Sequence, residues 1–511
     1  MRNFTFKGLF LTAVFMLLGC LSIQAANDDL ITKQITIKLD KAGTLPNKIA
    51  ISEMYKITNL KIIGEINGTD WNFIREMAGR DFKGEKTDGK LSILDLSEAK
   101  IVAGGDAYVR FSENYYTSND KLGDYVFYGC SGLTSLTLPS SVTSIGMGAF
   151  YGCWKLTSLT IPSGVTSIGY SAFRGCSGLT NLTIPSSVTE IGDKAFYGCS
   201  GLTSLTIPSG VTSIGGGTFE GCSGLTSLTI PSGVTSIGKS AFRDCSGLTS
   251  LTLPSSVTSI GDYAFAGCSG LTSLTIPSGV TSIGGGTFWG CWKLTSLTLP
   301  SGVTSIGNYT FTGCSGLTSL TLPSGVTSIG DYAFQDCSGL TSLTLPSGVT
   351  SIGICAFYDC SGLTSLTIPS SVTEIGDKAF YGCSELTSLT IPSSVTEIGW
   401  GAFRGCSGLT SIYVYPENLP ELGIDIFTGC DAKNCTVYVP KGTYDAYKSS
   451  EFGYFEKIVE FDATGIDKVT TSTNAKEVSR YSVNGQRLVG PTKGLNIVKY
   501  SDGSVKKVAV E

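Results

Sequence analysis

The residues best suited to chemistry in this chain are its cysteines, because a thiolate can act as a nucleophile, bind a metal or form a disulfide. The chain has 17 cysteines, and one stands at every 23rd position from Cys130 to Cys406. It contains no histidine. The commonest general base and metal ligand is therefore missing, and every Cys-His or Ser-His arrangement for nucleophilic catalysis is excluded. The regular cysteines need a structural explanation instead.

Other motifs of catalytic or metal sites are weak. Cys355 with Cys360, and Cys430 with Cys435, have C-x4-C spacing, but a zinc site would need four ligands brought together. The stretch "GRDFKGEK" comes nearest to a phosphate-binding loop and has Glu85 where the lysine must stand. An enzyme would need a site built from Asp, Glu, Tyr or Lys outside the regular region. We therefore predict that the protein is not an enzyme and has no catalytic residue, metal or cofactor.

The cysteines belong to a repeated unit of 23 residues. Aligned on Leu133, twelve units follow in register, and a thirteenth from Leu409 carries one extra residue before Cys430. Each reads L-x-x-L-x-(L/I)-P-S-x-V-T-x-I-G-x-x-(A/T)-F-x-x-C, in which apolar positions before the proline alternate with Ser and Thr. This alternation predicts a short strand with one buried face, which ends at the proline because proline has no N–H for a ladder. One unit cannot bury its apolar face alone, so we predict a solenoid of stacked units with parallel strands.

Within such a coil, the cysteine is expected inside the turn beside the phenylalanine, as a small buried side chain with a weak donor. Neighbouring coils would bring these thiols within disulfide range. A bridge, however, would pair two coils and distort both, whereas free thiols let every coil be alike. We therefore expect free thiols along the array, although an exported location permits oxidation. A local disulfide between Cys430 and Cys435 stays an alternative, because this region leaves the regular spacing.

The period, the proline, the I-G step and the A-F-x-x-C ending resemble the BspA-like class of leucine-rich repeats, which occurs on surface proteins of anaerobic bacteria and of some parasitic protozoa. The resemblance covers Leu133 to Cys430. It implies a leucine-rich repeat solenoid of the α/β horseshoe class, predominantly β and right-handed, closed by a capping segment at each end. It also implies attachment to host matrix proteins such as fibronectin or fibrinogen, or to other bacterial cells.

The composition divides the chain into five segments. Arg2 and Lys7 precede the apolar run "LFLTAVFMLLGCLSI", which predicts a cleaved export signal over residues 1–25. The "LLGC" stretch leaves open a lipoprotein in which Cys20 carries the lipid. No other stretch is apolar over the length that a spanning helix needs, so we expect a protein at the cell surface, in the outer membrane or secreted. The remaining segments are an amino-terminal cap (26–120), the repeat array (121–431), a carboxy-terminal cap (432–464) and a small β tail (465–511).

The caps have patterns of their own. In the amino-terminal cap, Leu60–Ile63 and Leu91–Leu96 are strand-like, and Thr69 or Asp70 would cap a short helix that ends at Gly79. In the carboxy-terminal cap, "VPKGTYDAYKSSEFGYF" predicts a strand followed by an aromatic-rich helix. Both segments can cover the exposed ends of a solenoid, as its solubility requires.

The tail contains two hairpin signals, Asn484 with Gly485 and Asp502 with Gly503. It resembles the carboxy-terminal sorting or attachment segments that end many exported proteins of the same bacterial group. The alternative is a pair of hairpins that packs beside the carboxy-terminal cap.

With 36 basic and 41 acidic residues, the chain shows no positive footprint for nucleic acid. The candidate for recognition is the position after each phenylalanine, which varies between units while the strand positions hardly change. Tyrosine, tryptophan and arginine, which are enriched at binding hot spots, are frequent there, and two units add a tryptophan after the cysteine. Side chains that merely shield the edge of the coil are the alternative. The predicted binding edge consists of Tyr151, Trp154, Arg174, Tyr197, Arg243, Trp289, Trp292, Tyr358, Tyr381 and Arg404.

These observations support an exported, surface-located scaffold that binds an extracellular protein or cell-surface ligand, as an adhesin. A structural spacer without a ligand of its own is the alternative. Near-duplicate units favour the spacer, for example "SSVTEIGDKAFYGCS" at Ser186 and again at Ser370, since duplication changes length easily. Ice binding by the regular threonine rows is also conceivable from their geometry.

Overall fold

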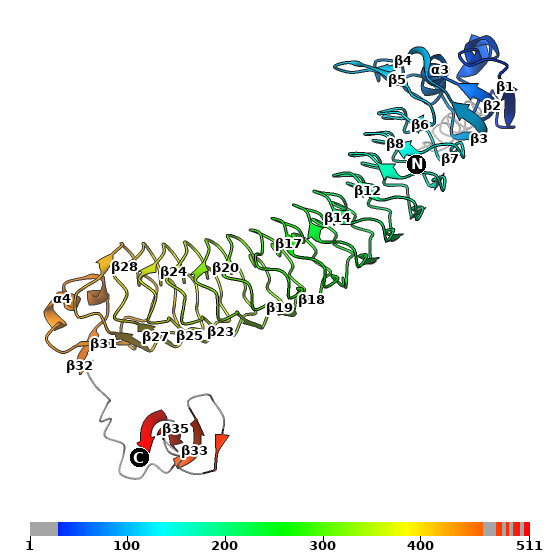
Figure 1. The fold of residues 1–511 in the computed structure, drawn as a ribbon. Helices are drawn as coiled ribbons and strands as arrows, with labels where there is room; N and C mark the ends of the chain where they lie inside the picture. The colour runs from blue at the N-terminus through cyan, green and yellow to red at the C-terminus, as the bar shows by residue number, and fades with distance from the viewer. Residues whose placement is uncertain (1–28, 463–476, 483–486, 490–493, 501–504, 511) are drawn as a thin grey trace, which may run out of the picture. The chain divides into compact units, whose positions relative to one another are not determined.

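The computed structural model describes residues 29–462, 477–482, 487–489, 494–500 and 505–510 (Figure 1). The chain divides into two compact units, Met1–Glu460 and Phe461–Glu511. In the larger unit, coil follows coil between the two caps, and the strands of neighbouring coils pair in parallel. The predominantly β leucine-rich repeat solenoid predicted from the repeated unit is confirmed. The predicted export signal lies outside the described residues.

Each unit contributes a short strand to a first parallel ladder. In β7 (Ser135–Thr137) and β9 (Ser158–Thr160), Leu136 pairs with Leu159, one unit further on, and both side chains are buried. The Ser and Thr on either side of each leucine face outward, because neighbouring residues of a strand point to opposite faces. The ladder continues through β11 (Asn181–Thr183), β13 (Ser204–Thr206), β15 (Ser227–Thr229), β18 (Ser273–Thr275), β19 (Ser296–Thr298), β21 (Ser319–Thr321), β23 (Ser342–Thr344), β25 (Ser365–Thr367), β27 (Ser388–Ile391) and β29 (Ser411–Val414).

A second ladder forms where each unit reaches its I-G step. Ile145 and Ile168 pair across β8 (Ser144–Ile145) and β10 (Ser167–Ile168), and both are buried. The array begins with β6 (Lys121–Leu122), which pairs with β8. The later strands are β12 (Glu190–Ile191), β14 (Ser213–Ile214), β16 (Ser236–Ile237), β17 (Ser259–Ile260), β20 (Ser305–Ile306), β22 (Ser328–Ile329), β24 (Ser351–Ile352), β26 (Glu374–Ile375), β28 (Glu397–Ile398) and β30 (Glu421–Leu422).

The third side of each coil runs from the I-G step to the cysteine, and its hydrogen bonds point the other way along the array. The N–H of Phe150 donates to the carbonyl of Ala172 in the following unit at 2.7 Å. In the second ladder, by contrast, the N–H of Thr166 donates to the carbonyl of Thr143 in the preceding unit at 2.9 Å. On the third side, the first unit therefore presents carbonyls to the amino-terminal cap and the last unit presents N–H groups to the carboxy-terminal cap.

The core is a column of stacked phenylalanines with a column of thiols beside it. From Phe127 to Phe427, rings of successive units stack with centroids 5.1–5.9 Å apart. The carbonyl of Phe150 accepts two hydrogen bonds, from the N–H of Cys153 and from the Sγ of Cys176 in the next unit, both at 3.1 Å. A cysteine is thus a buried donor to the preceding unit. The described cysteines are free thiols, Cys430 and Cys435 included.

The amino-terminal cap extends the first ladder. Its strands β1 (Ile35–Lys38), β2 (Asn59–Ile66) and β3 (Ile93–Ile101) add to β7 in the parallel order β1-β2-β3-β7-β9. β2 contains the predicted segment Leu60–Ile63, and β3 begins two residues later than the predicted Leu91–Leu96 and runs further. Helix α3 (Gly68–Met77) ends where expected but begins differently, because Asn67 is its N-cap and Asp70 completes the capping box from the third helical position. The other elements are η1 (Leu45–Asn47), α2 (Ile51–Met54) and the antiparallel strands β4 (Gly104–Arg110) and β5 (Asn114–Thr117).

Two arginines of the amino-terminal cap replace the missing preceding coil. The buried guanidinium of Arg75 donates to the carbonyls of Tyr125 at 2.9 Å and Val126 at 2.8 Å. The Nε of Arg80 donates to the carbonyl of Gly129 at 2.9 Å. The Val126 carbonyl is equivalent to those of Ala149 and Ala172, which accept an N–H from the preceding coil, and would otherwise be buried without a donor. The carbonyls of Tyr125 and Gly129 also accept the N–H groups of Tyr128 and Ser131.

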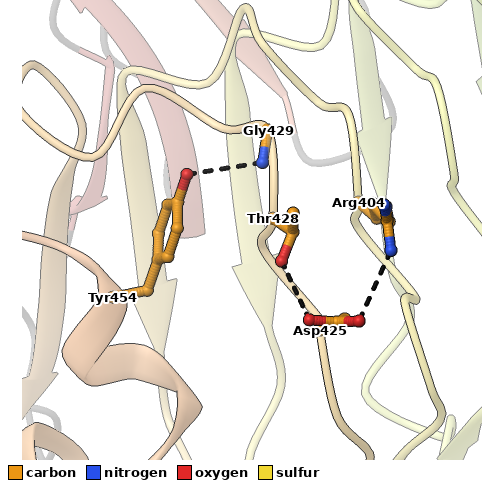
Figure 2. A network of polar contacts seen from close by, with 5 residues as sticks. All are labelled: Arg404, Asp425, Thr428, Gly429 and Tyr454. Carbon is orange, nitrogen blue, oxygen red and sulfur yellow. Dashed lines mark hydrogen bonds and ion pairs between the residues drawn. The ribbon is translucent and has the colours of Figure 1, made fainter.

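The carboxy-terminal cap closes the other end. It consists of β31 (Thr436–Pro440), α4 (Tyr444–Lys448), η2 (Glu451–Tyr454) and β32 (Lys457–Phe461). β31 and α4 correspond to the predicted strand and aromatic-rich helix. Phe452 and Phe455 pack against the last ring of the column, that of Phe427, with centroids 5.0 Å apart. The hydroxyl of Tyr454 accepts the orphan N–H of Gly429 at 3.3 Å (Figure 2).

The tail forms an antiparallel sheet in the order β34-β33-β35-β36, from β33 (Glu477–Ser482), β34 (Arg487–Leu488), β35 (Gly494–Tyr500) and β36 (Val505–Val510). The two predicted turns, at Asn484 with Gly485 and at Asp502 with Gly503, lie outside the described residues. The strands on either side of each turn pair with one another in antiparallel fashion. In the part of the chain that the structure describes, no helix has the length and apolar character needed to cross a membrane.

Candidate binding face

The third side of the array carries the residues that differ between units. We call this side the variable face and define it as the two residues after each I-G step and the residue after each phenylalanine. Along this side the Phe and the residue before it point into the core and are buried, as Ala149 and Phe150 are. Most of the intervening side chains are half-buried or exposed and can vary without disturbing the core, and the buried ones are the small side chains of Ser171, Ser240, Ala266, Thr312 and Cys355.

Members of the predicted binding edge contact one another across units. The Arg174 guanidinium lies between two rings, 5.2 Å from the centroid of Tyr151 and 4.4 Å from that of Tyr197. Cation–π contacts of this kind are worth about 0.5–1 kcal/mol at exposed sites. Further along, Tyr358 and Tyr381 stack with centroids 4.7 Å apart. The coil spacing thus holds these side chains in fixed positions at the surface.

The other two arginines of the predicted edge have carboxylate partners. Arg404 lies 3.4 Å from Asp425, whose other oxygen accepts the hydroxyl of Thr428 (Figure 2). Arg243 lies 3.5 Å from Asp244, measured from Nε. This Nε is buried and has no hydrogen-bond partner, so the separation from Asp244 is an ion pair without a hydrogen bond.

The three predicted tryptophans are the most exposed members of the edge, at 51% for Trp154, 43% for Trp289 and 57% for Trp292. Trp154 stands beneath the ammonium of Lys155, 4.8 Å away. Trp289 and Trp292 belong to the same unit, but among the described residues no ring contact joins them. Only Trp289 belongs to the variable face, since Trp292 follows the cysteine.

Some polar residues of the variable face have a structural role. An Asp or Asn directly after the I-G step accepts the N–H of the equivalent residue one unit later, as Asp377 does from Trp400 at 2.7 Å. The same bond links each of these acceptors to the following unit: Asp124, Asp193, Asp262, Asn308 and Asp331. These side chains are therefore tied to the array rather than available for a partner.

Two hollows open on the variable face. The larger, about 590 Å³, we call the Trp289 hollow; its walls include Arg243, Tyr263, Trp289, Tyr309, Gln335 and Asp336. The smaller, about 320 Å³, lies beside the β4–β5 strands; its walls include Phe111, Tyr115, Tyr125, Tyr128, Tyr151 and Arg174. The sequence prediction therefore found Arg243 and Trp289 of the larger hollow and Tyr151 and Arg174 of the smaller one. The prediction did not show that these residues line common hollows.

The tyrosines that the sequence analysis missed stand second after the I-G step, in the left-handed region. Tyr263, Tyr309 and Tyr332 have φ of 56°, 59° and 57°. Bulky residues rarely adopt this conformation, which costs about 1–2 kcal/mol relative to right-handed backbone. Glycine fills the same position in other units, Gly286 among them, with φ of 63°. The repeated appearance of tyrosine at a position that suits glycine was a signal available in the sequence.

Comparison with known proteins identifies the architecture. The family model described as a BspA type leucine-rich repeat region, in six copies, matches residues 120–249, 235–348 and 327–452. These matches cover well over half of the chain. The chain belongs to the BspA-type leucine-rich repeat family.

A solved structure of a leucine-rich repeat protein agrees with this architecture. A leucine-rich repeat protein from Bacteroides ovatus is 29% identical, with 73% of this chain and 84% of that chain covered and a TM-score of 0.52. A leucine rich cell surface protein from Faecalibacterium prausnitzii is also 29% identical over 73% of this chain and 89% of that chain, with a TM-score of 0.42. No curated protein matches the chain. BspA-type membership indicates a protein-binding protein at the cell surface or outside the cell.

Proposed function

We propose that this BspA-type protein is exported and acts as an adhesin, binding an extracellular protein through its variable face. The Tyr151–Arg174–Tyr197 stack is the observation that carries the proposal. Tyrosine and arginine are enriched at binding hot spots. Here each holds the next in place, so little side-chain freedom remains to be lost on binding, and that lowers the cost of association.

The chemistry of the chain fits binding better than catalysis. The chain has no histidine, and within the described residues no group of His, Cys, Asp and Glu is arranged to hold a metal ion. The thiols of the array are buried and bonded to carbonyls, so they are poor nucleophiles. We therefore propose a non-catalytic protein. The net charge of −5 gives no reason to expect nucleic acid as its partner.

A solid-phase assay tests the adhesin proposal. The purified chain is applied to immobilised fibronectin, fibrinogen and whole bacterial cells, and the Arg174→Ala variant is compared with Lys293→Ala, which removes an exposed cation outside the variable face. We expect saturable binding to at least one of these partners, weakened about tenfold by Arg174→Ala, a loss of roughly 1.4 kcal/mol. Lys293→Ala should bind as the unmodified chain does. If none of the three partners binds saturably, the adhesin proposal is wrong.

The spacer is a second candidate, favoured by the near-identical units of the array. Deletion of two whole units, residues 202–247, separates the two functions. A spacer loses reach in proportion to the length removed, wherever the deletion lies. An adhesin loses binding only when the deleted units carry its contacts.

The anchoring of the protein is also a proposal. The tail is an antiparallel sheet that forms a compact unit apart from the array. We propose that it serves as a sorting or attachment segment, which a truncation after residue 464 tests. The truncated chain should be released from cells that retain the full chain.

A further inference from the structure

The Trp289 hollow combines aromatic rings with polar side chains. The rings of Tyr263, Trp289 and Tyr309 come from three successive units, and the side chains of Arg243 and Gln335 lie among the polar walls. Its volume of about 590 Å³ lies within the 300–1,000 Å³ usual for ligand sites. Trp289 and Tyr309 remain 43% and 39% exposed, so apolar ring surface is open to a ligand.

The closure of the coil does not require these rings. Tyr263 and Tyr309 hold left-handed backbone that glycine adopts without cost, and Gly286 in the unit between them shows that the coil closes equally well with glycine. A Cβ on Gly286 would collide with the ring of Tyr263. The glycine therefore lets this ring lie over the next coil, where it forms a wall of the hollow. Tyr309 in turn stacks on Tyr332 of the following unit, with centroids 4.9 Å apart. Strained residues at positions where glycine would serve point to a function.

The same construction occurs six units earlier. Tyr125 is left-handed with φ of 57°, and a Cβ on Gly148 in the next unit would collide with its ring. The smaller hollow lies there, beside Arg174. A left-handed tyrosine followed by a glycine thus lines an aromatic hollow at both places, with an arginine in the wall each time.

The charged groups at the Trp289 hollow are few and of both signs. Arg243 and Asp336 line it, and Arg243 also pairs with Asp244, so no cluster of like charges favours a polyanion or a polycation. Within the described chain the Arg243 guanidinium donates no hydrogen bond, and its buried Nε meets Asp244 only as an ion pair at 3.5 Å. The hydroxyl of Thr312 donates to the carbonyl of Tyr332 at 2.6 Å and keeps its lone pairs free to accept. The hollow therefore offers donors and acceptors without a cluster of like charges.

We propose that the Trp289 hollow binds a neutral oligosaccharide. One side of a pyranose ring is covered by C–H bonds that pack on the negative face of an aromatic ring, here Trp289 and Tyr309. Its hydroxyls need both donors and acceptors once they leave water, and Arg243, Gln335 and Asp336 supply them. The inference goes beyond the adhesin proposal, which depends on the Tyr151–Arg174–Tyr197 stack and on a protein partner.

Titration of the full chain with cellohexaose, maltohexaose, mannohexaose and chitohexaose, followed by calorimetry and tryptophan fluorescence, tests this. We expect at least one of these neutral sugars to bind with a dissociation constant of about 1 mM or tighter. Trp289→Ala should weaken that binding about tenfold or more. Trp292→Ala is the matched control, because this exposed tryptophan of the same unit does not line the hollow, and it should bind as the unmodified chain does.

Three results would overturn the inference: no binding of any of the four sugars, equal losses for Trp289→Ala and Trp292→Ala, or Trp289-dependent binding of lysine-rich or glutamate-rich peptides instead. Tyr263→Gly keeps the backbone conformation, so it guards against misfolding, and this variant should also lose sugar binding.

Binding to fibronectin before and after removal of its sugar chains then shows whether the natural sugar belongs to a glycoprotein or to a free polysaccharide. Trp289-dependent binding that falls with those chains supports a glycoprotein, and hexasaccharide binding without such a fall supports free polysaccharide. Arg174-dependent binding of the stripped fibronectin reports on the adhesin proposal alone.

Discussion

The regular cysteines donate hydrogen bonds to buried carbonyls as well as filling space in the core. Their spacing predicted buried side chains beside the phenylalanines, and this is where the structure has them. The acceptor could not be predicted, because the bond from Cys176 reaches the carbonyl of Phe150 one unit back, and the sequence pattern does not say which carbonyl faces the thiol. Serine at this position would bury a more strongly hydrated group, which explains why a weak donor suits the core.

Burial of the thiols predicts loss of stability in alkali. Burial raises the pKa of Cys222, Cys291 and Cys337 to about 12. The unfolded thiol ionises near pH 8.5, so the folded state holds the proton over a range in which the unfolded state releases it. The stabilisation is complete below about pH 8.5 and should fall by about 1.4 kcal/mol per thiol and pH unit as the pH rises toward 12. Urea unfolding measured between pH 7 and 10.5 checks this.

The control for the alkaline measurement is the chain with Cys222, Cys291 and Cys337 all changed to Ala. Tyrosines and lysines titrate in the same range, but they are common to both proteins. The variant should therefore start less stable at pH 7 and lose stability less steeply. Parallel curves would show that the thiols do not cause the decline.

The left-handed tyrosines allow a second prediction at the scale of the residue. Tyr263→Gly and Tyr263→Ala remove the same ring, but only glycine adopts φ of 56° without strain. We expect the glycine variant to be more stable than the alanine variant by about 1 kcal/mol, measured by urea unfolding. The same pair at Ser158, on the first ladder, should show the opposite order, because glycine weakens a strand. An alanine variant as stable as the glycine variant at position 263 would mean that the backbone there is unstrained.

At the scale of the element, the caps contain contacts that the sequence pattern does not predict. The helix before Gly79 and the strands on either side of it were predictable from periodicity and capping residues. The role of Arg75 was not, because it follows from the reversed hydrogen bonds of the third side, which leave carbonyls facing the amino-terminal cap. The same reversal makes Tyr454 an acceptor at the other end, where the last unit presents N–H groups. Aromatic residues likewise close both ends of the phenylalanine column, Trp71 at the start and Phe452 at the finish.

Loss of Arg75 should therefore open the amino-terminal end. Its guanidinium is buried, and burial lowers its pKa, yet it donates to three carbonyls, including that of Asp81 at 3.2 Å. Arg75→Met leaves these acceptors without the charged donor, which costs about 3 kcal/mol. Hydrogen exchange should show faster exchange in the cap and in the first units, with little change near Phe427. Arg110→Met, at an exposed position on β4, is the control and should leave exchange unchanged. Slow exchange of the cap in Arg75→Met would contradict the role given to Arg75.

For the whole molecule, the sequence predicted the solenoid far better than the hollows. Every unit repeats the residues that face the core, so the pattern that predicts the coil recurs in each unit. Each hollow depends on a single combination of neighbours, such as Tyr263 of one coil over Gly286 of the next coil, beside Trp289. Only the stacking of the coils brings these residues together. Comparison of one repeat position at a time along the array does not reveal the hollow.

Because each coil contacts only its neighbours, removal of one whole unit should leave a folded protein. Deletion of residues 202–224 joins Gly201 to Leu225, so that the strands of the flanking units, β11 and β15, meet in the same register as before. The stability of a repeat array is close to a sum over units and their interfaces, so we expect an unchanged circular dichroism spectrum and a small fall in the melting temperature. Deletion of residues 202–213 is the matched control. It removes about half a unit and leaves one coil too short to pair with the units on both sides, so the array is interrupted there, apolar core is exposed, and this variant should aggregate. Equal folding of the two deletions would mean that the coils are held by something other than the register of their three hydrogen-bonded sides.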